Sequence, residues 1–175
     1  MRNNILLFFV VIATAATLLG FAMISFINAL ENGTKLAEIG LATVSLVGFF
    51  LLFLNGTFID SIYFKRMKGV MAIVIVGALL KILHLKFANE LISIGIFGII
   101  VIYFFSFLNK PIKRRLDYLK LAWVIVSYTG VLLVILHYIN RDYQILSSAI
   151  MWLAIIEYLR IESGKRKLQK RNLGE

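Results

Sequence analysis

The chain has 175 residues, of which 61% are hydrophobic and 16% charged, with one proline and no cysteine. A soluble domain carries about a quarter charged residues, so the composition argues against a soluble globular protein. The lack of cysteine excludes disulfides and thiolate metal sites. A net charge of +10 would favour nucleic acid as the partner of a soluble protein. Here the basic residues fall between long apolar runs, so we expect membrane orientation and no nucleic-acid partner.

Six apolar runs are long enough to cross a hydrocarbon core of about 30 Å, which takes roughly 20 helical residues. The expected spans are 5–28, 37–63, 69–86, 91–109, 118–138 and 144–160. Short connections make consecutive helices antiparallel, which gives hairpins over about 5–63, 69–109 and 118–160. The prediction is an all-α polytopic membrane protein, with a six-helix transmembrane domain over 1–163 and a basic tail over 164–175. A signal peptide is the alternative for the first run, but the run continues to Ile27, so we expect an uncleaved span.

The basic residues predict the orientation of these spans. Fifteen of the 19 Lys and Arg residues fall on one side and four on the other. Because basic loops stay in the cytoplasm, we expect both termini inside, in a bacterial inner membrane. The tail is expected to lie on anionic lipid headgroups at the cytoplasmic face, and its five basic residues are Lys165, Arg166, Lys167, Lys170 and Arg171.

An eight-residue phrase that ends in histidine occurs twice, 53 residues apart. The copies are Gly77–His84 and Gly130–His137, and six of their eight positions are identical. A repeat of this period indicates a helical hairpin used more than once. A weaker copy in the first hairpin carries Gly20, with Ile27 where the histidine would be. The alternative is chance similarity between apolar helices, and it is strongest for this first hairpin.

A polar stripe ends the third expected span. Gly77, Lys81 and His84 are spaced by four and three residues, so they share one helix face. A lysine in mid-bilayer costs roughly 2.5–3.5 kcal/mol, so Lys81 is expected to reach the outer interface. Its amine either snorkels to water or pairs with Glu38 or Glu90.

The two histidines, His84 and His137, are weak metal-ligand candidates, because no cysteine or carboxylate cluster accompanies them. We expect each to cap a helix end, and we expect no metal or cofactor. Gly77 and Gly130 are expected to admit a close neighbouring helix. No catalytic constellation stands out, so the chain is not expected to be an enzyme.

Two short motifs carry a family resemblance. The first runs from Val76 to Ile82, as Val-Gly-Ala-Leu-Leu-Lys-Ile, and His84 follows it; the second is Ser93-Ile94-Gly95. With them, residues 68–108 resemble the transmembrane hairpin of the gliding-motility GldL family, a motor component of type IX secretion. In the family that this hairpin resembles, a glutamate a few residues after Ser-Ile-Gly is implicated in proton flow together with the lysine. That place is close to Ile99, so the resemblance implies a related hairpin rather than a proton-driven motor.

The sequence therefore favours a non-enzymatic inner-membrane structural or accessory protein. Its partners would be the lipid bilayer and either another membrane protein or a second copy of the chain. The alternative is a small transporter or ion-conducting protein that uses the region of Lys81. A transporter is expected to show facing polar residues at mid-membrane or broken helices, and the apolar runs show neither strongly.

Overall fold

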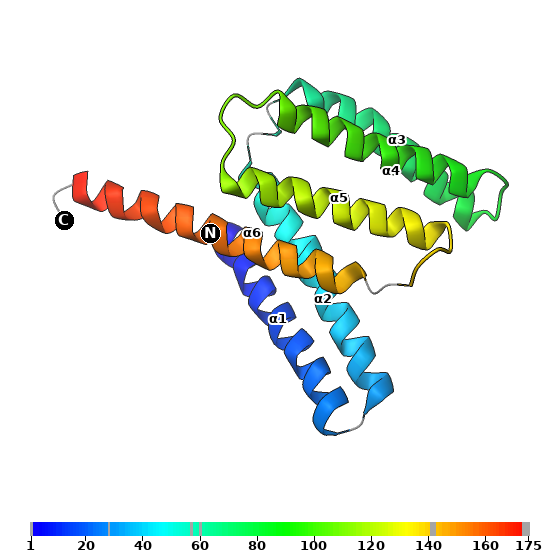
Figure 1. Ribbon diagram of the computed structural model, residues 1–175, viewed down its shortest axis with the longest axis horizontal. Helices are drawn as coiled ribbons and strands as arrows, with labels where there is room; N and C mark the ends of the chain where they lie inside the picture. The colour runs from blue at the N-terminus through cyan, green and yellow to red at the C-terminus, as the bar shows by residue number, and fades with distance from the viewer. Residues whose placement is uncertain (1, 28, 57, 60, 141–142, 173–175) are drawn as a thin grey trace. The chain divides into compact units, whose positions relative to one another are not determined.

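The computed structural model describes residues 2–27, 29–56, 58–59, 61–140 and 143–172, and side chains within 3–164 of these. The described residues form helices and no strand, which confirms the all-α prediction. The helices are α1 (Arg2–Phe26), α2 (Leu30–Leu54), α3 (Ile62–Ile82), α4 (Ala88–Leu108), α5 (Arg115–Ile135) and α6 (Tyr143–Asn172), shown in Figure 1.

Five of these helices are long and apolar enough to cross a membrane, judged over the described residues. They are α1, α2, α4, α5 and α6. The helix left out is α3, because three basic residues in its first two turns and Lys81 near its end confine its uncharged stretch to 69–80. The prediction of a multi-span helical membrane protein is thus confirmed, with five candidate spans instead of six.

The chain divides into two compact units, each assembled from separate segments. Unit 1 comprises Met1–Leu52, Arg114–Lys120 and Ser148–Glu175. Within it, α1 and α2 are antiparallel neighbours joined by a short turn (Figure 1). Small and branched residues line the buried face of α1, so its backbone lies close to α2; these residues are Val10, Ala13, Thr17 and Gly20.

Unit 2 comprises Phe53–Lys113 and Leu121–Ser147. Its main feature is the antiparallel pair of α3 and α4 (Figure 1). The two helices have 21 residues each, which corresponds to about 32 Å of helix. On α4 the buried residues recur at helical spacing and form one continuous face; they are Ala88, Ile92, Gly95, Ile96 and Ile99.

The second helix begins earlier than the sequence predicts. The expected span starts at residue 37, whereas α2 starts at Leu30. The additional turns are polar, but they are stabilised locally and by packing. The Lys35 amine lies 2.6 Å from the Glu31 carboxylate one turn away, and Gly33 is buried against α1. Tertiary packing therefore extends the helix into a segment whose composition resembles a loop.

The last helix continues farther than the sequence predicts. The expected span ends at residue 160, and the basic tail begins at 164. In the structure α6 runs without a break to Asn172. The backbone of the basic segment is therefore a continuation of the last helix, while its side chains from 165 onwards lie outside the described set.

Candidate functional site

The polar stripe at the end of α3 is open to the surroundings. Gly77 is buried, whereas Lys81 and His84 are exposed. Lys81 forms no ion pair with Glu90 among the described residues. The reason is the register of α4: Glu90 lies two positions after the buried Ala88, which is about 200° around the helix.

The other expected partner, Glu38, lies on α2 in unit 1 with an exposed side chain. Lys81 belongs to unit 2. The candidate residues Lys81, His84, His137 and Glu90 are all in unit 2. Lys81 is on α3, Glu90 is on α4, and the two histidines lie just beyond the ends of α3 and α5.

His84 terminates α3 through its backbone. Its φ of 52° is in the left-handed region that non-glycine residues seldom adopt. The His84 N–H donates to the Lys81 carbonyl at 3.1 Å, and the Leu85 N–H donates to the Leu80 carbonyl at 2.9 Å. These two bonds form a Schellman motif, which satisfies carbonyls that the end of a helix leaves unpaired.

His137 terminates α5 in the same way. Its φ is 61°, its N–H donates to the Val134 carbonyl at 3.0 Å, and the Tyr138 N–H donates to the Leu133 carbonyl at 2.9 Å. The α3–α4 turn and the C-terminal end of α5 lie at the same end of unit 2 (Figure 1). The shared phrase of the sequence thus corresponds to a shared helix-ending backbone motif.

The α3–α4 interface is close and apolar. A side chain added at Gly77 would meet the Ile92 backbone nitrogen at 2.9 Å, and one added at Gly95 would meet the Val74 nitrogen at 3.2 Å. One turn beyond Gly95, Ile99 is buried at 7% exposure. The position that the GldL resemblance associates with a glutamate is therefore close to a buried isoleucine.

The α1–α2 interface uses the same kind of contact. A side chain added at Gly20 would lie 2.5 Å from the Ala37 nitrogen and 2.7 Å from the Gly33 carbonyl oxygen. One added at Gly40 would lie 2.8 Å from the Thr17 nitrogen. These distances are below ordinary contact, so only glycine permits the observed approach of the two backbones.

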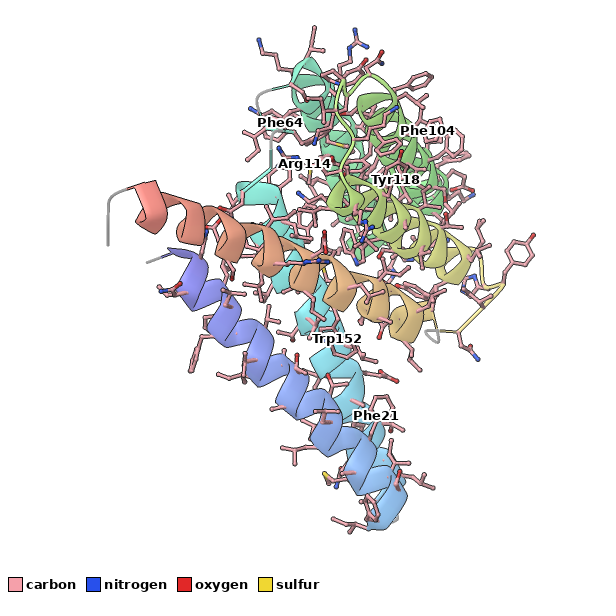
Figure 2. The ribbon with its side chains drawn as sticks, turned by 60° about the vertical axis from the view of Figure 1, so that its left-hand side comes forward. Phe21, Phe64, Phe104, Arg114, Tyr118 and Trp152 are labelled. Atoms are coloured by element: carbon pink, nitrogen blue, oxygen red, sulfur yellow. The ribbon has the colours of Figure 1, made fainter. Side chains whose placement is uncertain are left out.

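A polar network joins the helices of unit 1. The Ser148 hydroxyl is fully buried and donates to the Leu41 carbonyl at 3.0 Å, so the Ser45 hydroxyl at 3.1 Å is its donor. Trp152, labelled in Figure 2, donates its indole N–H to the Thr14 hydroxyl at 3.1 Å. These bonds join α6 to both helices of the α1–α2 pair.

Another polar contact of unit 1 lies at the C-terminal end of α2. The Lys120 amine donates to the Leu52 carbonyl at 2.9 Å, close to the C-terminus of that helix. A cation at this position is favoured by the helix dipole. The sequence gives Lys120 no distinguishing spacing, because its partner is a backbone atom 68 residues away.

No metal centre emerges from the described residues, where no three His, Cys, Asp or Glu side chains gather. In the same part of the chain, the Ser93 hydroxyl and the Gln144 amide oxygen are buried without a hydrogen-bond partner. Ser93 belongs to the Ser-Ile-Gly motif of the resemblance.

The long apolar helices, the glycine-mediated pairs and the internal serine network define a polytopic α-helical membrane protein in contact with the lipid bilayer. Residues 69–128, about a third of the chain, match the family model of the GldL N-terminal domain. The matched segment contains most of α3, all of α4 and the first two-thirds of α5. It extends the resemblance over 68–108 by about 20 residues. The chain thus carries a GldL-type membrane segment. Searches of curated proteins and of solved structures found no match.

Proposed function

We propose that the chain is a non-enzymatic accessory protein of the bacterial inner membrane that associates with other membrane proteins through its helices. The observation that carries this proposal is the apolar α3–α4 interface. Glycine and branched residues fill it, and Ile99 is buried near the place of the glutamate that the resemblance links to proton flow. A GldL-type hairpin without that carboxylate lacks the acidic half of the proton path that the resemblance implies.

The proposed topology has six spans, with α3 as the sixth. The uncharged stretch 69–80 rises only about 18 Å, which is less than the core of about 30 Å. However, α3 packs along α4 from Val70 opposite Gly98 to Gly77 opposite Ile92. A helix paired over this length shares the depth of its spanning partner. The lysines at both ends of the stretch can snorkel to the two interfaces.

The first and second hairpins are proposed to be copies of one unit. Gly20 meets Gly33 and Ala37, and Gly77 meets Ala88 and Ile92. Each residue of the second set lies 55 to 57 positions after its counterpart in the first.

A second contact is also matched between the two hairpins. Gly40 meets Thr17 in the first hairpin, and Gly95 meets Val74 in the second. Gly95 lies 55 positions after Gly40, and Val74 lies 57 positions after Thr17. Two matched contacts support common descent better than composition alone. The third hairpin departs from this pattern, since Gly130 meets the ring of Tyr143 rather than a backbone.

Both termini are proposed to be cytoplasmic, from the fifteen-to-four distribution of basic residues. In unit 2 this orientation places the α3–α4 turn outside. It also places Lys65 and Lys113 inside, at the opposite end of the hairpin. The exposed apolar side chains of α3, among them Met71, Ile75 and Leu79, then face lipid or a partner helix.

The competing function is ion conduction that uses Lys81. Proton flux into liposomes that contain the purified chain and a pH-sensitive dye separates the two functions. The proposal predicts no flux above that of empty liposomes, and it predicts that Lys81→Met leaves expression and thermal stability unchanged. Lys86→Met is the matched control, because Lys86 is also exposed at this turn. Proton flux that is lost in Lys81→Met and kept in Lys86→Met would refute the accessory function.

A further inference from the structure

Basic residues from both helices gather at one end of the α3–α4 hairpin. Lys65, Arg66 and Lys68 lie in the first two turns of α3, and Lys113 follows the end of α4. Because the helices are antiparallel, these segments lie at the same end of unit 2. We call this group the basic end.

A hydrogen bond joins the two sides of the basic end. The Asn109 side-chain amide donates to the Tyr63 hydroxyl at 2.6 Å and to the Phe105 carbonyl at 3.0 Å. Asn109 is also the residue that ends α4. The start of α3 is therefore tied to the end of α4, which keeps the two sets of cations together.

The cations of the basic end are not neutralised by carboxylates. None of Lys65, Arg66, Lys68 and Lys113 forms an ion pair within the part of the chain that the structure describes. Three of them lie beside aromatic rings instead. The Lys68 amine is 4.9 Å from the centre of the Phe64 ring, and the Arg66 guanidinium is 5.9 Å from that of Tyr63.

The third cation, Lys113, has its amine 5.2 Å from the centre of the Phe107 ring. Ring contacts restrain these side chains while leaving their positive charge available to an anion.

Aromatic residues form a layer next to the cations. Phe58 contacts Phe53, Phe64 and Tyr103, with ring centres 6.2, 6.1 and 5.4 Å apart. Phe64 is labelled in Figure 2 near the start of α3. Aromatic rings next to basic residues are typical of the membrane–water interface. Beyond this layer α3 exposes apolar side chains such as Met71 and Ile75, against which acyl chains can lie.

We infer that the basic end is a binding site for the phosphodiester headgroup of an anionic phospholipid. The cations supply the charge for the phosphate, the aromatic layer sets the depth, and the exposed apolar face of α3 accommodates the acyl chains. A free anion would use the first of these features only. The inference depends on the proposed orientation only for the leaflet, which is then the cytoplasmic one. Lipid binding in detergent tests it independently of topology.

The experiment titrates the purified full chain in mild detergent with phosphatidylglycerol or phosphatidylcholine and counts bound lipids by native mass spectrometry. The test variant is Arg66→Gln/Lys68→Gln. Since each cation contributes about a fivefold increase in anionic-lipid affinity, the double change should weaken phosphatidylglycerol binding about 30-fold. Phosphatidylcholine binding should be weak and unchanged.

A control variant removes the same kind of charge elsewhere. Lys35→Gln/Lys86→Gln acts on residues away from the basic end, so it should keep the wild-type preference for phosphatidylglycerol. The inference is overturned if the test variant binds within threefold of this control, or if millimolar inorganic phosphate displaces the lipid. If the test variant does not fold, Lys113→Gln should still weaken binding about fivefold, and an unchanged affinity there overturns the inference.

Discussion

Gly77→Ala tests the close helix packing, with Gly69→Ala as a matched control on the same helix. A side chain at Gly77 would lie 2.8 Å from Ile92 Cγ1 and 2.9 Å from the Ile92 nitrogen, so α3 and α4 must separate. Overpacking of this kind costs about 1–3 kcal/mol. Alanine recovers up to about 1 kcal/mol from its higher helix propensity. We therefore expect a net destabilisation of about 0–2 kcal/mol.

A side chain added at Gly69 would have no atom within 4 Å, so Gly69→Ala keeps only the stability gained from the higher helix propensity of alanine. Gly69→Ala should be about 0.5–1 kcal/mol more stable than the wild type. The assay is reversible unfolding of the purified chain in mixed detergent micelles, followed by circular dichroism. The free energies of unfolding of the two variants should differ by about 2 kcal/mol. Equal stabilities for Gly77→Ala and Gly69→Ala would refute the close α3–α4 contact.

Two further predictions use the same unfolding assay. His84→Gly and His137→Gly should each raise the free energy of unfolding by about 1 kcal/mol, because glycine adopts positive φ without the cost that an L side chain carries; a loss of stability would show that the imidazole itself holds the helix end. Ser148→Ala should lower the free energy of unfolding by about 0.6–1.7 kcal/mol, because the Ser45 hydroxyl and the Leu41 carbonyl lose their hydrogen-bond partner in apolar surroundings. An unchanged free energy of unfolding would contradict the serine network.

The sequence predicts the helices well because each apolar run must be helical inside a bilayer. It also identifies Gly77 and Gly130 as special positions, since glycine is costly in a helix unless a neighbour needs the space. It does not predict the start of α2. The polar segment near Gly33 resembles a loop by composition, and its contact with α1 helps to make it helical.

The polar contacts were harder to predict for a different reason. Ser148 and Lys120 have partners more than 60 residues away, and both of these partners are backbone carbonyls without a sequence signal. The sequence could not decide whether Lys81 pairs with Glu90 either, because spacing along the chain does not give the register between two helices. Local patterns therefore predict elements and faces, while long-range polar bonds depend on the tertiary arrangement.

The central claim is that α3 crosses the membrane with α4, which gives six spans. The chain lacks cysteine, so single cysteines can be placed without first removing native ones. Lys65→Cys lies in the first turn of α3, and Asn89→Cys lies in the first turn of α4, just after the α3–α4 turn. A membrane-impermeant maleimide applied to intact cells labels only the outer side. The account predicts immediate labelling at Asn89→Cys, and labelling at Lys65→Cys only after permeabilisation. Labelling of both positions under the same condition would place both ends of α3 on one side and contradict the six-span topology.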